Sequence, residues 1–173
     1  NNGTVDSTVR NPSFVYSAPG TYTVKLTASN TIGSDDEVKV GFVTVGQPLT
    51  FASFAPVADA FVSSSRVAKN YGSDVTLRVR NSTTVYRSYL RFTVSGLDGP
   101  VESARLRLFV TDSSPDGGSI YAVGSTWTET GISWSNAPAL PGSALTAIGA
   151  TPPVGSWVDV DLGAAITGNG TLS

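Results

Sequence analysis

The segment Ser125-Thr-Trp-Thr-Glu-Thr-Gly-Ile-Ser-Trp-Ser-Asn-Ala-Pro138 decides the fold of this chain. Its two tryptophans, Trp127 and Trp134, stand among small and turn-forming residues. Thr and Ser disfavour a helix, and Gly131 and Pro138 interrupt one, so the segment predicts strands and loops. Burying tryptophan removes a large apolar area from water, so we expect both rings to fill one end of a β core. An exposed platform for stacking a sugar is the alternative, which the isoleucine between them disfavours.

The composition favours an all-β protein. The chain has 173 residues, enough for one large or two small domains, and 40% hydrophobic with 14% charged residues is typical of an ordered chain. Gly, Ser, Thr and Val are abundant, which favours strands and tight turns. The net charge of −2 gives no overall attraction to nucleic acid. No apolar run approaches the roughly 20 residues that span a bilayer. We therefore expect neither a nucleic-acid partner nor membrane insertion.

The chain contains no Cys and no His. Disulfides and thiolate metal sites are therefore excluded, and the usual general base is missing. Asp159 and Asp161 share one strand face, but we interpret them as turn or strand-edge residues rather than a glycoside-hydrolysing pair. We predict that the chain is not an enzyme. It also lacks Met, even at position 1, so we expect it to be a processed or excised part of a longer protein.

Residues 1–46 contain two predicted strands. Thr21–Ser29 alternates strictly, with Tyr22, Val24, Leu26 and Ala28 on one face, which is typical of a half-buried strand. Glu37–Val45 is the second, and its apolar phase shifts beside a glycine. That glycine, Gly41, predicts a β-bulge.

This region resembles a known family. The run Asn11-Pro-Ser-Phe-Val-Tyr-Ser-Ala-Pro-Gly-Thr-Tyr-Thr-Val-Lys-Leu-Thr-Ala-Ser-Asn30, followed by Gly33-Ser34, is similar to the second half of a PKD domain. That family is a small immunoglobulin-like sandwich found as a spacer in secreted proteins. About three strands cannot close a sandwich. The resemblance therefore implies that the chain begins earlier or that another chain supplies the missing edge.

Residues 47–52 are the predicted linker, and residues 53–173 form the second domain. Its expected strands are short and separated by turn residues, which indicates a β-sandwich or jelly roll. The residues expected to face its core are Val75, Leu77, Val79, Leu90, Phe92, Val94, Ala104, Leu106, Leu108, Val110, Val158, Val160 and Leu162. The residues expected on the outer faces are Thr76, Arg78, Arg80, Arg87, Tyr89, Arg91, Arg105, Arg107, Asp159 and Asp161.

A second resemblance covers about 120 residues of this domain. The motifs in order are Ala58-Asp-Ala-Phe-Val62, Asn70-Tyr-Gly-Ser73, Tyr89-Leu-Arg-Phe92, Ser103-Ala-Arg-Leu-Arg-Leu108, Trp127-Thr-Glu129, Ile132-Ser-Trp134, Ala137-Pro138 and Trp157-Val-Asp-Val160. Together they resemble the DNRLRE-type domain, a jelly-roll family that includes alginate-binding carbohydrate modules. The name-giving late motif is absent, and we expect the last strands of the family to be missing. The predicted fold is thus a partial immunoglobulin-like sandwich followed by a jelly-roll β-sandwich.

Basic residues concentrate in the middle of the chain. Eight of the eleven lie between positions 66 and 107, with only three of the thirteen acidic residues. Alternation puts most of these arginines on outer strand faces, where neighbouring strands would form a basic stripe. Guanidinium groups bind carboxylates bidentately, so we expect an acidic polysaccharide such as alginate or pectate as ligand. The predicted binding residues are Arg66, Lys69, Arg78, Arg80 and Arg87. The alternative is a solvated face with cross-strand ion pairs.

A calcium site is a further expectation. Asp59, Asn70 and Asp74 offer oxygen ligands in a loop-rich region beside Gly72, and calcium takes several such oxygens. Jelly-roll carbohydrate modules often hold a structural calcium ion, so the resemblance implies one here. A second acidic cluster beside Gly117-Gly118 is better interpreted as a plain turn.

These observations support two functions. The first is a non-catalytic carbohydrate-binding segment of a secreted or cell-surface protein, with the PKD-like part as spacer. The alternative is a structural module of a surface filament, stalk or layer, in which neighbouring copies of the chain pair through open strand edges.

Overall fold

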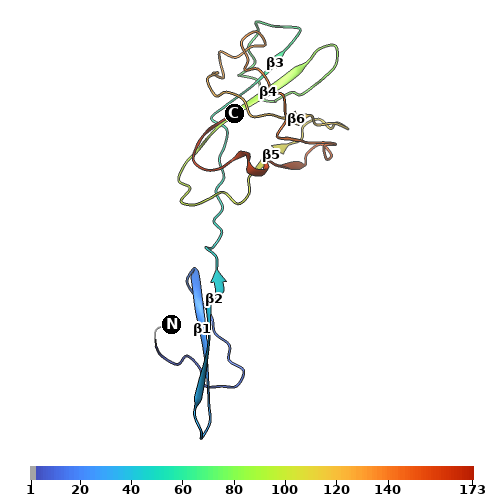
Figure 1. Ribbon diagram of the computed structural model, residues 1–173. Coiled ribbons are helices and arrows are strands. Elements are labelled where there is room, and N and C mark those ends of the chain that lie inside the picture. Colours follow the sequence, from blue (N-terminus) through green and yellow to red (C-terminus); the bar gives the residue numbers. More distant parts are fainter. Residues whose placement is uncertain (1–2) are drawn as a thin grey trace. The chain divides into compact units, whose positions relative to one another are not determined.

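The computed structural model describes residues 3–173, and within them the protein is all-β (Figure 1). This confirms the fold class expected from the composition. The chain divides into two compact units, Asn1–Phe51 and Ala52–Ser173, called unit 1 and unit 2 below. Every paired strand is antiparallel. The described residues contain no helix with the length and apolarity that crossing a membrane requires.

Unit 1 is built on one hairpin. Strands β1 (Gly20–Ser29) and β2 (Ser34–Val45) pair, and Asn30 makes the turn between them by accepting the Ile32 N–H at 2.8 Å. The register shifts opposite Gly41, whose φ of 63° is left-handed. The Gly41 N–H donates to the Thr23 hydroxyl at 3.2 Å. The predicted β-bulge is therefore confirmed.

The faces of this hairpin are largely open. Tyr22 and Val24 are half-buried, but Leu26 and Ala28 are exposed. The expected half-buried face is thus only partly formed. The physical reason is that no second layer covers the hairpin within the described part of unit 1, where no residue is buried.

Unit 2 contains three small sheets. Its elements are β3 (Ala58–Ser63), β4 (Tyr86–Val94), β5 (Arg105–Phe109), β6 (Ser119–Ile120), β7 (Thr146–Ala147), β8 (Trp157–Asp161), the 3-10 helix η1 (Gly163–Ala165) and β9 (Gly170–Leu172). The sheets have the orders β3-β4-β9, β5-β8 and β6-β7. Loops make up most of the rest, as Figure 1 shows.

The core of unit 2 forms on one face of the β3–β4 pair. Ala58, Ala60 and Val62 point to this face, and Tyr89 on β4 lies with them. Trp127 completes the cluster and is only 6% exposed. Trp134 is half-buried and packs against it. The interpretation of these tryptophans as core residues is confirmed.

The expected orientation of β4 was wrong for Arg87, Tyr89 and Arg91, although Val94, expected to face the core, is buried. Tyr89 is a core residue, and its ring meets Trp127 edge-on with centroids 6.0 Å apart. Arg87 and Arg91 share its face and lie over Trp134 and Trp127. The presence of arginines on this face led us to expect that it is exposed to solvent. In the structure, the tryptophan segment covers it. Because arginine and tyrosine have long apolar bodies, they can line such a face while their polar ends reach acceptors.

The expected strand at residues 75–79 does not form. Val75 is 100% exposed and Val79 is 61% exposed. A serine replaces the usual backbone pairing here, because the Ser88 hydroxyl accepts the Arg78 N–H at 3.0 Å and donates to the Arg78 carbonyl at 2.8 Å.

The β5–β8 pair follows the predicted alternation. Leu106 and Leu108 are half-buried and Val160 is buried, while both arginines of β5 and both aspartates of β8 are exposed. The register sets Arg107 opposite Asp159.

Candidate functional site

An aromatic cluster occupies the second face of the β3–β4 pair. At its centre is Phe61, which is 2% exposed. Tyr71 stacks on Phe61 with centroids 4.2 Å apart, and Tyr86 meets it edge-on at 5.7 Å. Phe61 faces away from the alanines of β3 because strand side chains alternate. The loop after β3 supplies Tyr71, and β4 supplies Tyr86.

Each ring of this cluster carries one basic side chain. Lys69 Nζ lies 4.7 Å from the Tyr71 centroid, Arg78 Cζ lies 5.2 Å from that of Phe61, and Arg80 Cζ lies 5.9 Å from that of Tyr86. We call these six residues the Phe61 cluster. Aromatic faces attract cations and hold their stems. Arg80 is fixed further because its Nε donates to the Ser82 hydroxyl at 2.7 Å.

The three cations of the Phe61 cluster are exposed and have no counter-ion among residues 3–173. Within residues 3–173, the ion pairs are Lys25–Asp36 and Arg107–Asp159. Neither involves the cluster. Its positive charge is therefore free to attract a carboxylate from outside the chain.

The other two predicted binding residues lie apart from these rings. Arg66 is exposed in the turn that leads to Lys69, whose N–H donates to the Arg66 carbonyl at 3.0 Å. Arg87 is on the core face of β4, with its Cζ 4.7 Å from the Trp134 ring. The expected flat basic stripe is thus divided between two faces of one sheet. The sequence analysis did not identify Phe61, Tyr71 and Tyr86 as site residues. The alternation of side chains along β3 could have identified Phe61, because it places Phe61 on the face opposite Ala58 and Ala60.

The three residues predicted to bind calcium have different environments. The Asn70 amide donates to the carbonyls of Glu129 and Ile132, both at 2.7 Å, and its Oδ1 accepts the Gly72 N–H at 3.1 Å. Asn70 therefore joins its loop to the tryptophan segment. Asp74 is exposed.

Asp59 lies close to a second carboxylate. Its backbone N–H donates to Glu129 Oε2 at 3.1 Å. Burial raises the pKa of Asp59, and the Glu129 carboxylate adds to this increase. The described residues contain no group of three or more acidic side chains that could hold a metal ion. The predicted ligands Asp59, Asn70 and Asp74 therefore fit a calcium ion only in part. The carboxylate that raises the pKa of Asp59 belongs to Glu129 and not to Asp74.

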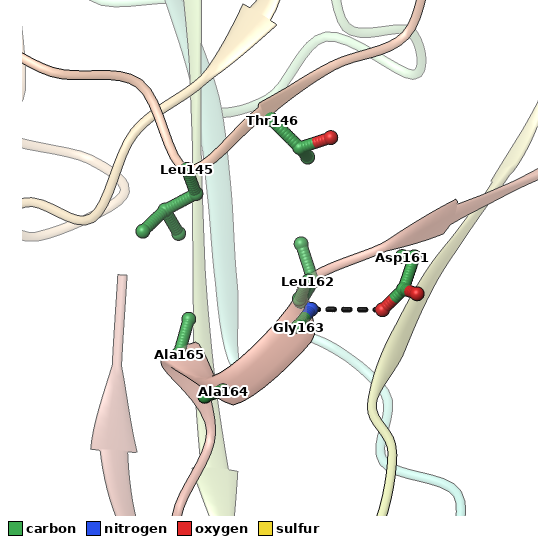
Figure 2. Close-up of a pocket in the computed structure, with 7 residues that line it drawn as sticks. All are labelled: Leu145, Thr146, Asp161, Leu162, Gly163, Ala164 and Ala165. Atoms are coloured by element: carbon green, nitrogen blue, oxygen red, sulfur yellow. Dashed lines mark hydrogen bonds between the residues drawn. The ribbon is translucent and has the colours of Figure 1, made fainter.

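Two of the hollows on the described surface of unit 2 contain no basic residue. Figure 2 shows the first, which measures about 420 Å³ and lies where β8 meets η1. Its one charged side chain, Asp161, accepts the Gly163 N–H at 2.8 Å. The second measures about 410 Å³ and is lined by Trp127 and its neighbours. These hollows lack the cations that mark the Phe61 cluster.

Unit 2 is thus an all-β unit with exposed cations that lie against aromatic rings. Comparison with known families is more specific. The model of carbohydrate-binding module family 96 matches residues 50–173, and the PKD domain model matches residues 1–41. The chain therefore belongs to carbohydrate-binding module family 96, with part of a PKD domain ahead of it. The expected pairing of a partial PKD domain with a carbohydrate-binding module is confirmed. No curated protein and no solved structure matches the chain.

Proposed function

We propose that unit 2 binds an acidic polysaccharide such as alginate, as a non-catalytic segment of an extracellular protein with the PKD region as spacer. The observation that carries this proposal is the Phe61 cluster, where Lys69, Arg78 and Arg80 are exposed without counter-ions. The family match supplies the class of ligand. PKD and carbohydrate-binding domains are typical of extracellular proteins.

The chemistry follows from the side chains. Arg78 and Arg80 can each take a uronate carboxylate on two parallel N–H groups, and Lys69 adds a point charge. The rings hold all three stems before the ligand arrives, which reduces the entropy lost on binding. Arg66 extends the surface along the same loop. Arg87 would contact the polymer only where it passes the Trp134 edge.

A structural calcium ion is a separate part of the proposal. Asp59 would be its main ligand, with Asn70 Oδ1 and with Glu129 taking the role predicted for Asp74. The supporting observation is the closeness of two carboxylates whose repulsion a cation would relieve. If calcium binds here, adding calcium should raise the melting temperature of the parent chain and chelation should lower it. Neither treatment should change the melting temperature of Asp59→Asn. Equal melting temperatures of the parent in both conditions would exclude the site.

The test of the main proposal is alginate binding at low and high ionic strength. The variant Lys69→Gln/Arg78→Gln/Arg80→Gln removes the three charges, and Arg10→Gln in unit 1 is the matched control. Each exposed pair contributes about 0.5–1 kcal/mol, so the triple variant should weaken binding by about 10- to 100-fold. Salt should weaken the parent in the same direction. A parent chain that does not bind alginate at low salt contradicts the proposal.

One observation favours a second function. The β1–β2 hairpin leaves Leu26, Val40 and Phe42 exposed at 65%, 83% and 63%. In the described part of unit 1, β1 and β2 pair only with each other, so each has an open edge that can accept a strand from a neighbouring copy, as in a surface filament or layer. Light scattering of the purified chain tests this: concentration-dependent association supports it, and a stable monomer argues against it.

A further inference from the structure

A second aromatic surface lies on the outer face of the β5–β8 pair. Phe109 and Trp157 are 50% and 54% exposed. They stand opposite each other in the register, with ring centroids 5.1 Å apart at 65°. The inner faces of the same strands supply the buried contacts, so the fold does not need these rings for its core.

An ion pair lies beside the two rings. Arg107 Cζ is 5.0 Å from the Trp157 ring, and Arg107 Nε is 3.4 Å from Asp159 Oδ1. Both side chains are well exposed, at 62% and 46%. We call Arg107, Phe109, Trp157 and Asp159 the β5–β8 shelf.

The charge on the shelf is balanced. The register continues with Arg105 opposite Asp161, so two arginines face two aspartates along this face. A polyanion would therefore gain little electrostatic attraction on this face, in contrast to the Phe61 cluster. Exposed aromatic rings next to both a donor and an acceptor match a pyranose ring, which has apolar C–H faces and a rim of hydroxyls.

We propose that the β5–β8 shelf binds uncharged sugar residues of a polysaccharide. One face of the sugar stacks on Trp157 beside Phe109, while its hydroxyls donate to Asp159 and accept from the Arg107 guanidinium. This inference rests on carbohydrate binding by unit 2 but not on an acidic ligand. The chain would then have two sugar-binding surfaces of different chemistry.

The experiment measures binding to a soluble β-glucan, a galactomannan and a xylan, with alginate in parallel. We expect at least one neutral polysaccharide to bind with an affinity that salt barely changes, because no net charge is involved. Tryptophan is a frequent hot spot, so Trp157→Ala should weaken this binding by about 30-fold or more. Phe109→Ala should act in the same direction. Neither change should alter alginate binding.

The triple variant of the Phe61 cluster is the matched control, because it should lose alginate and keep the neutral ligand. The failure of one proposal is thereby distinguished from the failure of the other. Trp157→Tyr keeps a stacking ring and should retain most of the affinity for the neutral polysaccharide. This variant keeps the proposal testable if Trp157→Ala folds poorly. Two results overturn the inference: no binding of any neutral polysaccharide, or an oligomer of the parent chain that Trp157→Ala converts to monomers. The second result would assign the shelf to a copy of the chain.

Discussion

Asn70→Asp should strongly destabilise unit 2, although it changes the side chain by one atom. The Asn70 amide nitrogen donates to the carbonyls of Glu129 and Ile132, both at 2.7 Å. An aspartate cannot donate either bond and sets an anionic oxygen against two carbonyl oxygens. The bond accepted from the Gly72 N–H survives. The change therefore tests the link between this loop and the tryptophan segment.

The magnitude follows from the two lost bonds. Each contributes about 1 kcal/mol net, and each partly buried carbonyl left without a donor adds a comparable penalty. The sum is about 2–4 kcal/mol. For a unit of this size, 1 kcal/mol corresponds to about 4 °C, so we expect a decrease in melting temperature of about 8–16 °C. At acid pH the introduced carboxyl protonates and regains one donor, so the deficit should shrink.

Tryptophan fluorescence is the appropriate assay, because Trp127, Trp134 and Trp157 are the chain's three tryptophans and all lie in unit 2. Asn136→Asp is the matched control. It removes one exposed bond, from the Asn136 amide to the Gly131 carbonyl at 2.9 Å, and keeps the bond accepted from the Ser133 N–H. We expect it to cost about 1 kcal/mol. If both variants melt at the same temperature, the reasoning about Asn70 is refuted.

Two other changes test the same region. The pKa of Asp59 is raised above its ordinary value of 3.8 by burial and then by Glu129, so the folded state binds the proton more tightly and stability falls as the pH rises through the window above 3.8. In calcium-free buffer, Asp59→Asn should abolish this loss and stabilise the protein at neutral pH, as thermal melts across pH would show; an unchanged pH profile would contradict it. Gly72→Ala should destabilise unit 2 by about 1–3 kcal/mol, since its Cβ would overlap the Glu129 carbonyl. Denaturant titration checks this, with Gly142→Ala, which meets open space, as control.

Local periodicity was sufficient where only one face of a strand is covered. The alternation of β5 and β8 correctly separates Leu106 and Val160 from the arginines and aspartates. The bulge at Gly41 was also predictable, because a glycine stood where the apolar phase shifted. These features depend on neighbours along the chain, which the sequence displays directly.

Periodicity failed where both faces of a strand are covered. Alternation along β4 defines two sets of residues but does not say which set meets the core. Tyr89 and Arg91 have polar ends, yet Tyr89 contacts Trp127 and Arg91 donates to the Trp127 carbonyl at 2.5 Å. These contacts join residues 36–38 positions apart, so local pattern cannot reveal them. For the same reason, the sequence pattern did not reveal that the cations of the Phe61 cluster lie on aromatic rings.

The arginines of unit 2 show why charge counts alone misjudge a binding surface. Arg91 uses its guanidinium on backbone carbonyls, and Arg107 is paired with Asp159. Arg78 and Arg80 have similar alternating neighbours in the sequence but no carboxylate partner in the described chain. Only such unpaired cations can exchange bound counter-ions for a polyanion. The salt dependence of alginate binding should therefore correspond to about four charges, those of Lys69, Arg78, Arg80 and the exposed Arg66, rather than to all eight in this window. A dependence near eight would mean that a polyanion also displaces Asp159 from Arg107 and Trp127 from Arg91, which would require the core of unit 2 to open.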